Sequence, residues 1–416
     1  MNRLRDPQWF LILMFLGIIS GVPLIQMLVE ARQEEGVRAI DVFSQAPTAA
    51  NLRAFERSLE TANWAARVSR PWMRFAQFEW LKDGGAKVVI GSEGWYFYKP
   101  GLNYMLARPE RAKAASATND PLAAIVDFRD QLAARGIRLV VMPVPNKESV
   151  YPDRLTPRAE ALRGVRAPST QDLLERLRTN NVEVIDLFEC FAQARQRAGA
   201  ALEAPLYLAQ DTHWSPAGVG LAAKAVARRL LELGWVRRGQ VDYNERPAPL
   251  RRLGDVLRML QAPLIERRVH PEPVPCVQVV RRDNGELYKE TADAEILVLG
   301  DSFVRIYQRD EPGAAGFIAH LAKELKQPLM ALINDGGGST LVRQELLGNP
   351  AFLRNKKVVL WEFVERDIGL GLHGWKRVPL PPVVAGANEQ PSVSVFLREH
   401  VVWSKIANQY HVVLCR

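Results

Sequence analysis

The chain has 416 residues, of which 48% are hydrophobic and 24% are charged, and it carries a formal net charge of +9 at pH 7. These fractions are typical of a globular protein with a large buried core, and they exclude a disordered or fibrous chain. The positive charge would attract an anionic polymer or anionic lipid headgroups, although arginines spread over solvated faces explain it at least as well; nucleic acid is a poor candidate because no recognition motif is present.

The first thirty residues predict a membrane anchor. Trp9–Val29 is almost wholly apolar and, at about twenty residues, long enough to span a bilayer core of roughly 30 Å. Arg3 and Arg5 precede it and a mixed to acidic segment follows, so the N-terminus is expected in the cytoplasm. A cleaved signal peptide is the alternative, but the apolar run is longer than usual and no small-x-small site follows closely. We therefore expect residues 1–35 to form a single-pass anchor.

The next segment connects the anchor to the body. Residues 36–86 show a helical pattern rich in aromatic side chains, which we expect to pack in a core rather than to bind a ligand. The apolar runs Lys87–Ile90 and Trp95–Tyr98 then flank a turn that contains glycine. Two such runs around a short turn are typical of a β-hairpin.

Helical and β-rich segments alternate from residue 120 onward. Asp120-Pro121 starts a helix that Gly136 ends, and Ser215-Pro216 starts another that Gly234 ends. A further helix is expected near Gln171–Thr179, and the expected strands are Ile137–Met142, Val182–Leu187, Ile296–Leu299, Leu329–Ile333 and Val358–Phe363. This alternation predicts an α/β fold with an open, mostly parallel sheet and helices on both faces.

Two segments break this alternation. Residues 239–290 are rich in proline and arginine, so we expect a connection or a small subdomain there. Residues 381–416 first become polar and rich in proline and then mildly apolar, and we assign them no role beyond a C-terminal tail. Residues 87–380 are thus the expected catalytic domain.

The sequence offers little for metal or nucleotide binding. Cys190, Cys276 and Cys415 are too few for a disulfide framework or a thiolate metal site, and whether two of them pair is left open. The six histidines are dispersed, without ligand spacing. Gly336–Gly338 lacks the Lys-Ser/Thr that completes a phosphate-binding loop. We expect neither a metal nor a cofactor.

Two short motifs together carry residues for acyl transfer. Gly300-Asp301-Ser302 directly follows an expected strand, at the carboxyl end where open α/β sheets bind ligands. Asp211 and His213 precede a helix start, which places them on a loop above the sheet. A serine hydroxyl needs an imidazole to take its proton, and a carboxylate fixes the tautomer of that imidazole. Each motif alone is weak, but together they predict Ser302 as nucleophile, His213 as base and Asp211 as its orienting acid.

These motifs resemble a known family. Leu299–Phe303 resembles the serine block of the SGNH hydrolase superfamily. Asp211–Trp214 resembles the acid–histidine block of its alginate O-acetyltransferase branch, in which the two blocks occur in permuted order. Similar segments follow the same order between about residues 87 and 367, namely Gly91–Tyr98, Pro145–Lys147 with Tyr151-Pro152, Gly254-Asp255 and Trp361–Arg366. The resemblance implies an SGNH-hydrolase-like fold.

The resemblance also implies an activity and a location. The protein would be a single-pass enzyme of the inner membrane, with its catalytic domain in the periplasm. It would transfer acetyl groups to hydroxyls of an exported polysaccharide, alginate-like or another exopolysaccharide, through an acetylated Ser302. A multi-pass membrane O-acyltransferase partner would supply the acetyl group, so no cofactor is needed.

Further site residues are suggested by the resemblance and by placement. In SGNH enzymes a glycine and an asparagine join the serine amide in the oxyanion hole, and Asn334 and Gly337 are the candidates here; a glycine-rich turn without a catalytic role is the alternative. Arg366 would face an anionic substrate or pair with Glu362 or Glu365. Trp214 would wall the pocket or simply pack.

Two other functions fit the same residues. A carbohydrate acetylesterase would use the same triad, because the triad does not decide whether water or a sugar hydroxyl attacks the acyl-enzyme. A non-catalytic scaffold of a polysaccharide export complex would retain Ser302 and His213 as remnants. The presence of serine, histidine and aspartate together favours an enzyme.

Overall fold

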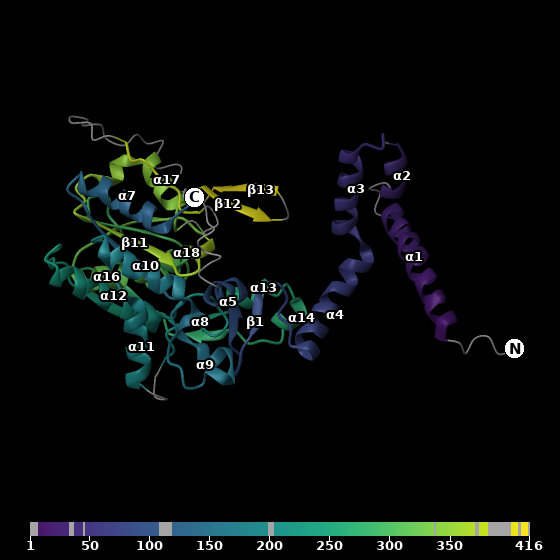
Figure 1. The fold of residues 1–416 in the computed structure, drawn as a ribbon, viewed down its shortest axis with the longest axis horizontal. Coiled ribbons are helices and arrows are strands. Elements are labelled where there is room, and N and C mark those ends of the chain that lie inside the picture. The colour runs from purple at the N-terminus through teal and green to yellow at the C-terminus, as the bar shows by residue number, and fades with distance from the viewer. Residues whose placement is uncertain are drawn as a thin grey trace. The chain divides into compact units, whose positions relative to one another are not determined.

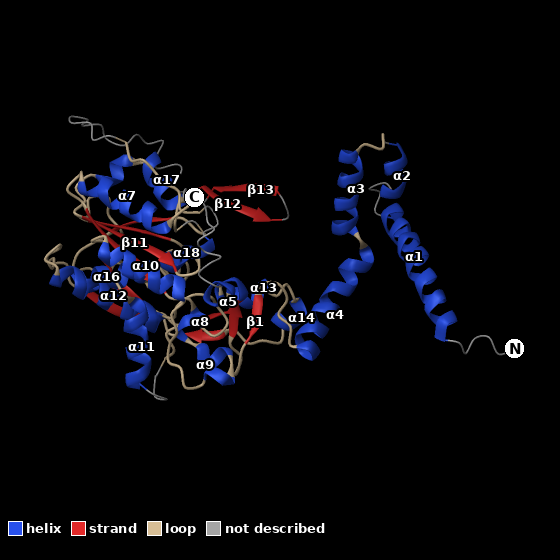
Figure 2. Cartoon of the chain, in the orientation of Figure 1, coloured by secondary structure: helices blue, strands red, loops and turns tan. Residues whose placement is uncertain are grey.

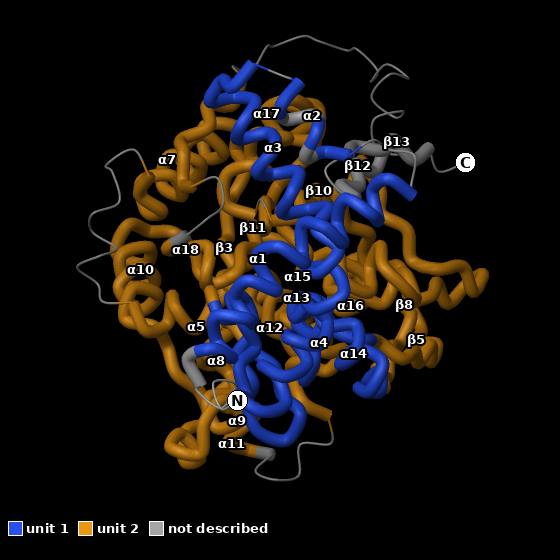
Figure 3. Tube along the Cα trace, turned by 90° about the vertical axis from the view of Figure 1, so that its right-hand side faces the viewer, with its two compact units in different colours: residues 1–99, 209–211, 253–272 blue, residues 100–208, 212–252, 273–416 orange. Residues whose placement is uncertain are grey.

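The computed structural model describes residues 7–32, 37–44, 46–107, 119–198, 204–336, 338–370, 374–381, 401–406 and 409–414. The chain divides into two compact units, which Figure 3 shows in different colours. Unit 1 comprises residues 1–99, 209–211 and 253–272. Unit 2 comprises residues 100–208, 212–252 and 273–416. Of the residues expected in the triad, Asp211 falls in unit 1, and His213 and Ser302 fall in unit 2.

Unit 1 begins with four helices, which the sequence pattern predicts. They are α1 (Pro7–Arg32), α2 (Arg38–Ser44), α3 (Ala49–Ala62) and α4 (Trp64–Leu81). Within α1, Trp9–Arg32 has a mean hydropathy of 2.3 and is long enough to cross a bilayer, which is consistent with a single-pass anchor. Near the end of α1, Gln26 accepts a hydrogen bond of 2.6 Å from the backbone N–H of Trp64, which ties α1 to the start of α4.

The core of unit 1 forms around the expected hairpin. Strands β1 (Val88–Ile90) and β2 (Tyr96–Tyr98) pair in antiparallel fashion, and helices α13 (Asp255–Met259) and α14 (Pro263–Glu266) complete the unit. Phe75 and Phe78 of α4 pack on this core, as expected for the aromatic stripe. Trp72 and Trp80 are instead 63% and 79% exposed, so for these two the expectation is wrong. With about 3.6 residues per turn, Trp80 falls on a different face of α4 from Phe75 and Phe78, whereas Trp72 lies about one turn before Phe75 on the same side.

Unit 2 contains the predicted open sheet. Its five strands are all parallel, in the order β10-β9-β11-β3-β4. Their bounds are β3 (Arg138–Val144), β4 (Glu183–Val184), β9 (Ile296–Gly300), β10 (Met330–Ile333) and β11 (Val358–Val364). Every residue of β9 and β11 is buried, because helices cover both faces of the sheet. Figures 1 and 2 show α7 and α17 on one side of the sheet and α12 and α16 on the other.

The helices of unit 2 extend the predicted set. The expected ones are α7 (Pro121–Ala133), α10 (Pro168–Thr179) and α12 (Pro216–Glu232). Those that the sequence pattern did not reveal are α5 (Lys99–Leu106), α8 (Lys147–Val150), α9 (Pro152–Leu155), α11 (Leu187–Ala198), α15 (Ser302–Arg305), α16 (Phe317–Leu325), α17 (Leu341–Gly348) and α18 (Asp367–Leu370), with 3-10 turns at Pro157–Ala159 and Pro350–Leu353. The expected strand Val182–Leu187 is short because α11 already begins at Leu187.

The remaining segments are small. Residues 239–290 hold β5 (Tyr243–Pro247), β6 (Leu250–Arg252), β7 (Glu272–Val274) and β8 (Val277–Arg281) besides α13 and α14, and β5 pairs with β8 in antiparallel fashion. The tail contains an antiparallel pair, β12 (Val401–Ile406) and β13 (Gln409–Leu414). Cys190 and Cys276 are free thiols, and Cys415 lies outside the described residues.

Candidate active site

The turn that carries the serine is sterically tight. Strand β9 ends at Gly300, and α15 begins at Ser302. A Cβ atom on Gly300 would lie 2.5 Å from Val304 Cγ2 and 2.7 Å from Glu362 Oε2, so only glycine fits here. Asp301 Oδ1 accepts a hydrogen bond of 2.8 Å from the N–H of Phe303 and so caps the start of α15. This geometry fixes where the serine side chain emerges from the sheet.

Ser302 and His213 lie together, although 89 residues separate them in the chain. The distance between Ser302 Oγ and His213 Nε2 is 2.9 Å, which is a hydrogen bond. His213 lies just before α12, whose N-cap Ser215 accepts a hydrogen bond from Gly218 N. The contact is the one a general base needs to take the proton of the serine.

The other ring nitrogen of His213 also faces a polar atom. Nδ1 lies 3.2 Å from the hydroxyl oxygen of Thr212, a residue the sequence gave no reason to single out. The hydroxyl oxygen can accept a hydrogen bond from Nδ1–H, and this tautomer leaves Nε2 without a proton and free to act as base. Asp211 is fully buried in unit 1, where its Oδ2 accepts a hydrogen bond of 3.2 Å from Asp255 N. Its role toward His213 stays a prediction.

Trp214 packs in the interior of the protein. It is fully buried, and its indole N–H donates a 3.0 Å hydrogen bond to the backbone carbonyl of Phe303. Its backbone carbonyl in turn accepts from the hydroxyl of Tyr307, at 3.2 Å. These two bonds join the histidine segment to the serine turn. The residue therefore holds the two motifs in register.

The oxyanion donors are only partly identified. The backbone N–H of Ser302 has no acceptor among the described residues, so it is available to a developing oxyanion. The side-chain amide of Asn334 donates a hydrogen bond to Glu345 Oε2 at 2.9 Å and so connects the end of β10 to α17. Gly337 lies outside the described residues, while a Cβ on the neighbouring Gly338 would approach Asp301 Oδ2 at 3.1 Å. Asn334 and Gly337 remain predictions as oxyanion donors.

A buried pair of carboxyl groups supports the serine turn. Glu362 Oε2 accepts a 3.0 Å hydrogen bond from the backbone N–H of Asp301, and both side chains are buried. Burial raises the pKa of Asp301, and burial together with the Asp301 charge raises the pKa of Glu362 well above its ordinary value. Two carboxyl groups this close cannot both ionise readily, and we assign the proton to Glu362. The sequence suggested Glu362 only as a partner of Arg366.

Glu365 and Arg366 follow β11 at the same edge of the sheet. Glu365 accepts hydrogen bonds from Ser149 Oγ (2.5 Å), Thr170 Oγ1 (2.9 Å) and Asn146 N (3.0 Å), so it anchors neighbouring helices. The guanidinium carbon of Arg366 lies 5.9 Å from the centre of the Phe303 ring. Arg366 is therefore close to the turn that carries Ser302, and its role toward a substrate stays a prediction.

Comparisons with known proteins give the family of the domain in which these residues lie. Residues 88–365, which include Ser302 and His213, match the family model described as "SGNH hydrolase-like domain, acetyltransferase AlgX". A Pseudomonas aeruginosa protein named "Probable alginate O-acetylase AlgJ" is 23% identical over 302 residues, which cover 68% of this chain and 71% of the relative. A protein of the same name from Azotobacter vinelandii is 26% identical over 297 residues, covering 68% and 70%.

One solved structure shares the fold. The O-acetyltransferase domain of Pseudomonas putida AlgJ aligns with a TM-score of 0.55 and 22% identity, over 68% of this chain and 92% of that domain. Residues 88–365 thus have the SGNH-hydrolase-like fold that the motifs imply.

Proposed function

Since this chain belongs to the family of SGNH hydrolase-like AlgX acetyltransferase domains, we propose that it transfers acetyl groups to a polysaccharide through an acetyl-serine at Ser302. It is an O-acetyltransferase, and its named relatives are alginate O-acetylases. The observation that carries the proposal is the 2.9 Å contact between Ser302 Oγ and His213 Nε2 at the carboxyl edge of a parallel sheet. That contact also favours an active enzyme over a scaffold.

The first half-reaction acetylates the enzyme. His213 takes the hydroxyl proton while Ser302 Oγ attacks the acetyl carbonyl of the donor, and the N–H of Ser302 stabilises the oxyanion. The bond between the acetyl carbon and the donor oxygen breaks, and His213 gives its proton to that oxygen. Thr212 at Nδ1, together with Asp211 two residues before His213, would hold the imidazole in the required tautomer.

The second half-reaction transfers the acetyl group from Ser302 to the acceptor and restores the free enzyme. A sugar hydroxyl loses its proton to His213 and attacks the acetyl-serine, and the proton returns to Ser302 Oγ as the ester bond breaks. Water in place of the sugar hydroxyl would give an esterase. A polymer that reaches the site and excludes water favours transfer.

The location follows from the anchor. Helix α1 would hold the enzyme in the inner membrane with residues 36–86 as lead-in, the catalytic domain 87–380 in the periplasm and 381–416 as tail. An exported polymer, alginate or a similar polysaccharide, would meet the site there. A multi-pass membrane O-acyltransferase would pass acetyl groups from the cytoplasm to Ser302.

The direction of the reaction can be tested on the full-length chain in detergent. A small acetyl ester would serve as donor, and alginate or neutral oligosaccharides as acceptors. Acetylated oligosaccharide measured by mass spectrometry, absent in Ser302→Ala, would support transfer. Release of free acetate alone, at a rate that no acceptor changes, would contradict transfer and support the esterase.

A further inference from the structure

The backbone turns sharply at Tyr307, five residues after Ser302. Its φ angle is 60°, in the left-handed region that favours glycine and is sterically costly for a bulky side chain. Eight non-glycine residues of the described chain have a positive φ, and Tyr307 is the aromatic one among them. Its side chain is also fully buried. Strain of this kind persists only where the surrounding structure fixes it, and it gathers at functional sites.

The loop that follows holds Tyr307 in this conformation. The carbonyl of Tyr307 accepts a 2.9 Å hydrogen bond from the backbone N–H of Ala315, which closes the loop 307–315. At the end of this loop, a Cβ atom on Gly316 would lie 2.6 Å from the carbonyl oxygen of Ile306 and 2.6 Å from the backbone nitrogen of Gln308. Only glycine allows so close an approach. The backbone on both sides of Tyr307 is therefore fixed by the returning chain.

The buried ring of Tyr307 brings a hydroxyl to the histidine segment. This hydroxyl donates a 3.2 Å hydrogen bond to the backbone carbonyl of Trp214, the residue that follows His213. The indole N–H of Trp214 donates in the opposite direction, to the carbonyl of Phe303, the residue that follows Ser302. The two hydrogen bonds span 93 and 89 residues of the chain. Together they connect the neighbour of the base to both ends of the segment 303–307.

The ring of Phe303 packs between the two motifs. Its centroid lies 4.8 Å from that of the His213 imidazole and 5.5 Å from that of Trp214. A displacement of Trp214 therefore also displaces the imidazole, whose Nε2 lies 2.9 Å from Ser302 Oγ. Reacting groups must keep a narrow geometry, so even a small displacement at this contact slows the reaction.

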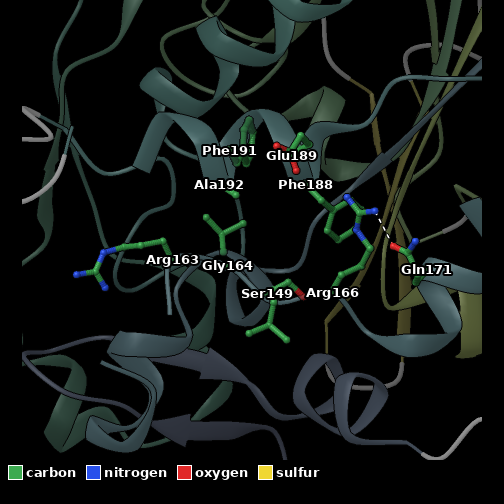
Figure 4. Close-up of a pocket in the computed structure, with 11 residues that line it drawn as sticks. Ser149, Arg163, Gly164, Arg166, Gln171, Phe188, Glu189, Phe191 and Ala192 are labelled. Atoms are coloured by element: carbon green, nitrogen blue, oxygen red, sulfur yellow. Dashed lines mark hydrogen bonds between the residues drawn. The ribbon is translucent and has the colours of Figure 1, made fainter. Parts of the chain in front are cut away.

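The contact between Tyr307 and Trp214 lies in the packed interior of unit 2, since both side chains are fully buried. A pocket of about 270 Å³ lies elsewhere in the same unit. Figure 4 shows it between Glu189 and Ala192 of α11 on one side and Ser149 on the other. Neither Tyr307 nor Trp214 lines this pocket. A change at Tyr307 therefore acts on the two motifs and leaves the lining of the pocket as it is.

We propose that Tyr307 is a positioning residue for acetyl transfer, whose hydroxyl holds the Trp214 carbonyl, and with it His213, in register with Ser302. The inference rests on the proposed function and adds to it a residue that acts through His213 and not on the substrate. The left-handed turn is part of this role, because it directs the ring of Tyr307 into the interior, where the Trp214 carbonyl lies.

Removal of the hydroxyl alone tests this role, on the full-length chain in detergent. Tyr307→Phe is compared with Tyr288→Phe, because Tyr288 is also buried and its hydroxyl accepts a 3.0 Å hydrogen bond from the N–H of Leu329. Leu329 directly precedes β10, which runs parallel to β9, so this control lies at the opposite edge of the sheet from Ser302. Both variants lose one buried hydroxyl, and their melting temperatures should fall by similar amounts.

Only Tyr307→Phe should slow the reaction. With a small acetyl ester, its kcat should fall roughly five- to tenfold while KM stays within about twofold of wild type, since a misplaced base affects the chemical step and not substrate binding. Incorporation of para-aminophenylalanine at position 307 restores a donor and should recover most of the lost kcat. A folded Tyr307→Phe chain with wild-type kcat, an equal loss of kcat in Tyr288→Phe, or no recovery with the amino analogue would each overturn the inference.

The imidazole itself gives a readout that does not depend on turnover. Selective isotope labelling of the histidine side chains for NMR, with His213→Ala for assignment, reports the ring of His213 directly. Its resonances should shift in Tyr307→Phe and stay unchanged in Tyr288→Phe, and unchanged resonances in both variants would overturn the positioning role. A wild-type chain without turnover would count against the proposed function alone, and the His213 resonances would then decide on Tyr307.

Discussion

The orientation of the turn at residues 301–303 determines where the Ser302 hydroxyl points. Buried polar atoms from distant parts of the chain hold this turn in place. Glu362 accepts the N–H of Asp301, and Trp214 donates to the carbonyl of Phe303. The Oε1 atom of Glu362 is buried without a partner among the described residues, so a charged carboxylate there would be costly. We infer that Glu362 acts as a neutral positioning residue and not as an acid or base in the reaction.

Substitution of Glu362 separates its hydrogen bond from its charge. Glu362→Gln keeps an acceptor for Asp301 N–H and is neutral, so activity should stay within about threefold of wild type. Glu362→Ala leaves that buried N–H unpaired, which costs about 1–3 kcal/mol, and activity should fall at least roughly tenfold. Rates with a small acetyl ester measure both. A Gln variant as inactive as the Ala variant would show instead that a negative charge is required.

For single residues, the sequence predicts which side chains suit the reaction better than it predicts which side chains touch in the fold. Ser302, His213 and Asp211 stand out because their residue types and their places after a strand and before a helix fit one reaction. Thr212 and Glu362 gain their roles only from the folded geometry, since the Glu362 contact spans 61 residues. A single sequence carries no local signal for such a contact.

Helix α12 positions the histidine segment by direct backbone contact. Gly218 lies in its first turn, and a Cβ there would be 2.3 Å from the carbonyl oxygen of Leu206 and 3.1 Å from Trp214 Cβ. The helix can approach this closely only because residue 218 has no side chain. Gly220, in the same helix, has open space around it.

These two glycines form a matched pair of variants. Gly218→Ala should push α12 from the segment 206–214, destabilise the fold by about 1–3 kcal/mol and lower activity, because it overpacks a close backbone contact. Gly220→Ala should raise stability slightly, by up to about 1 kcal/mol, since alanine favours a helix. Thermal unfolding and ester turnover measure both effects. Similar melting temperatures for the two variants would contradict the close packing of α12.

Elements with strong local patterns are predictable, and short ones are not. The fully apolar runs that became β3, β9, β10 and β11, and the capped helices α7 and α12, are confirmed. The short helices α8, α9 and α15 have no periodicity to detect. Strand β4 ends early because Asp186 accepts the N–H of Glu189 and so starts α11. Tertiary contacts and caps decided these boundaries.

At the scale of the whole molecule, buried acids make stability depend on pH. Glu148 is buried, and burial raises its pKa to about 7; burial also raises the pKa of Asp367 to about 7. Both groups ionise near their much lower ordinary values in the unfolded chain, so the folded state holds more protons between those values and pH 7. Their contribution to stability is complete at low pH and is lost as the pH rises through 7.

The free energy of unfolding should therefore fall between about pH 5 and pH 8, by up to about 3 kcal/mol for each such group. Glu148→Gln, which is neutral at every pH, should flatten this dependence. Urea unfolding of the full-length chain at both pH values measures it. A slope equal to that of wild type would show that Glu148 is ionised in the folded protein across this range.

The sequence predicts three features of the chain as a whole: the α/β class, the order of the two motifs and the apolar N-terminal helix. It does not predict the identity of the polymer, because polysaccharide recognition depends on surfaces assembled from separate segments.

The central claim is that Ser302 carries the acetyl group, and intact-mass analysis tests it most directly. The full-length chain would be incubated briefly with a small acetyl ester, with Ser302→Ala and His213→Ala in parallel. We predict a mass gain of one acetyl group in the wild type, mapped to Ser302 by peptide sequencing, and none in either variant. An acetyl group of equal yield in Ser302→Ala, or none in a folded wild-type chain that still acetylates oligosaccharide, would contradict the acetyl-serine mechanism.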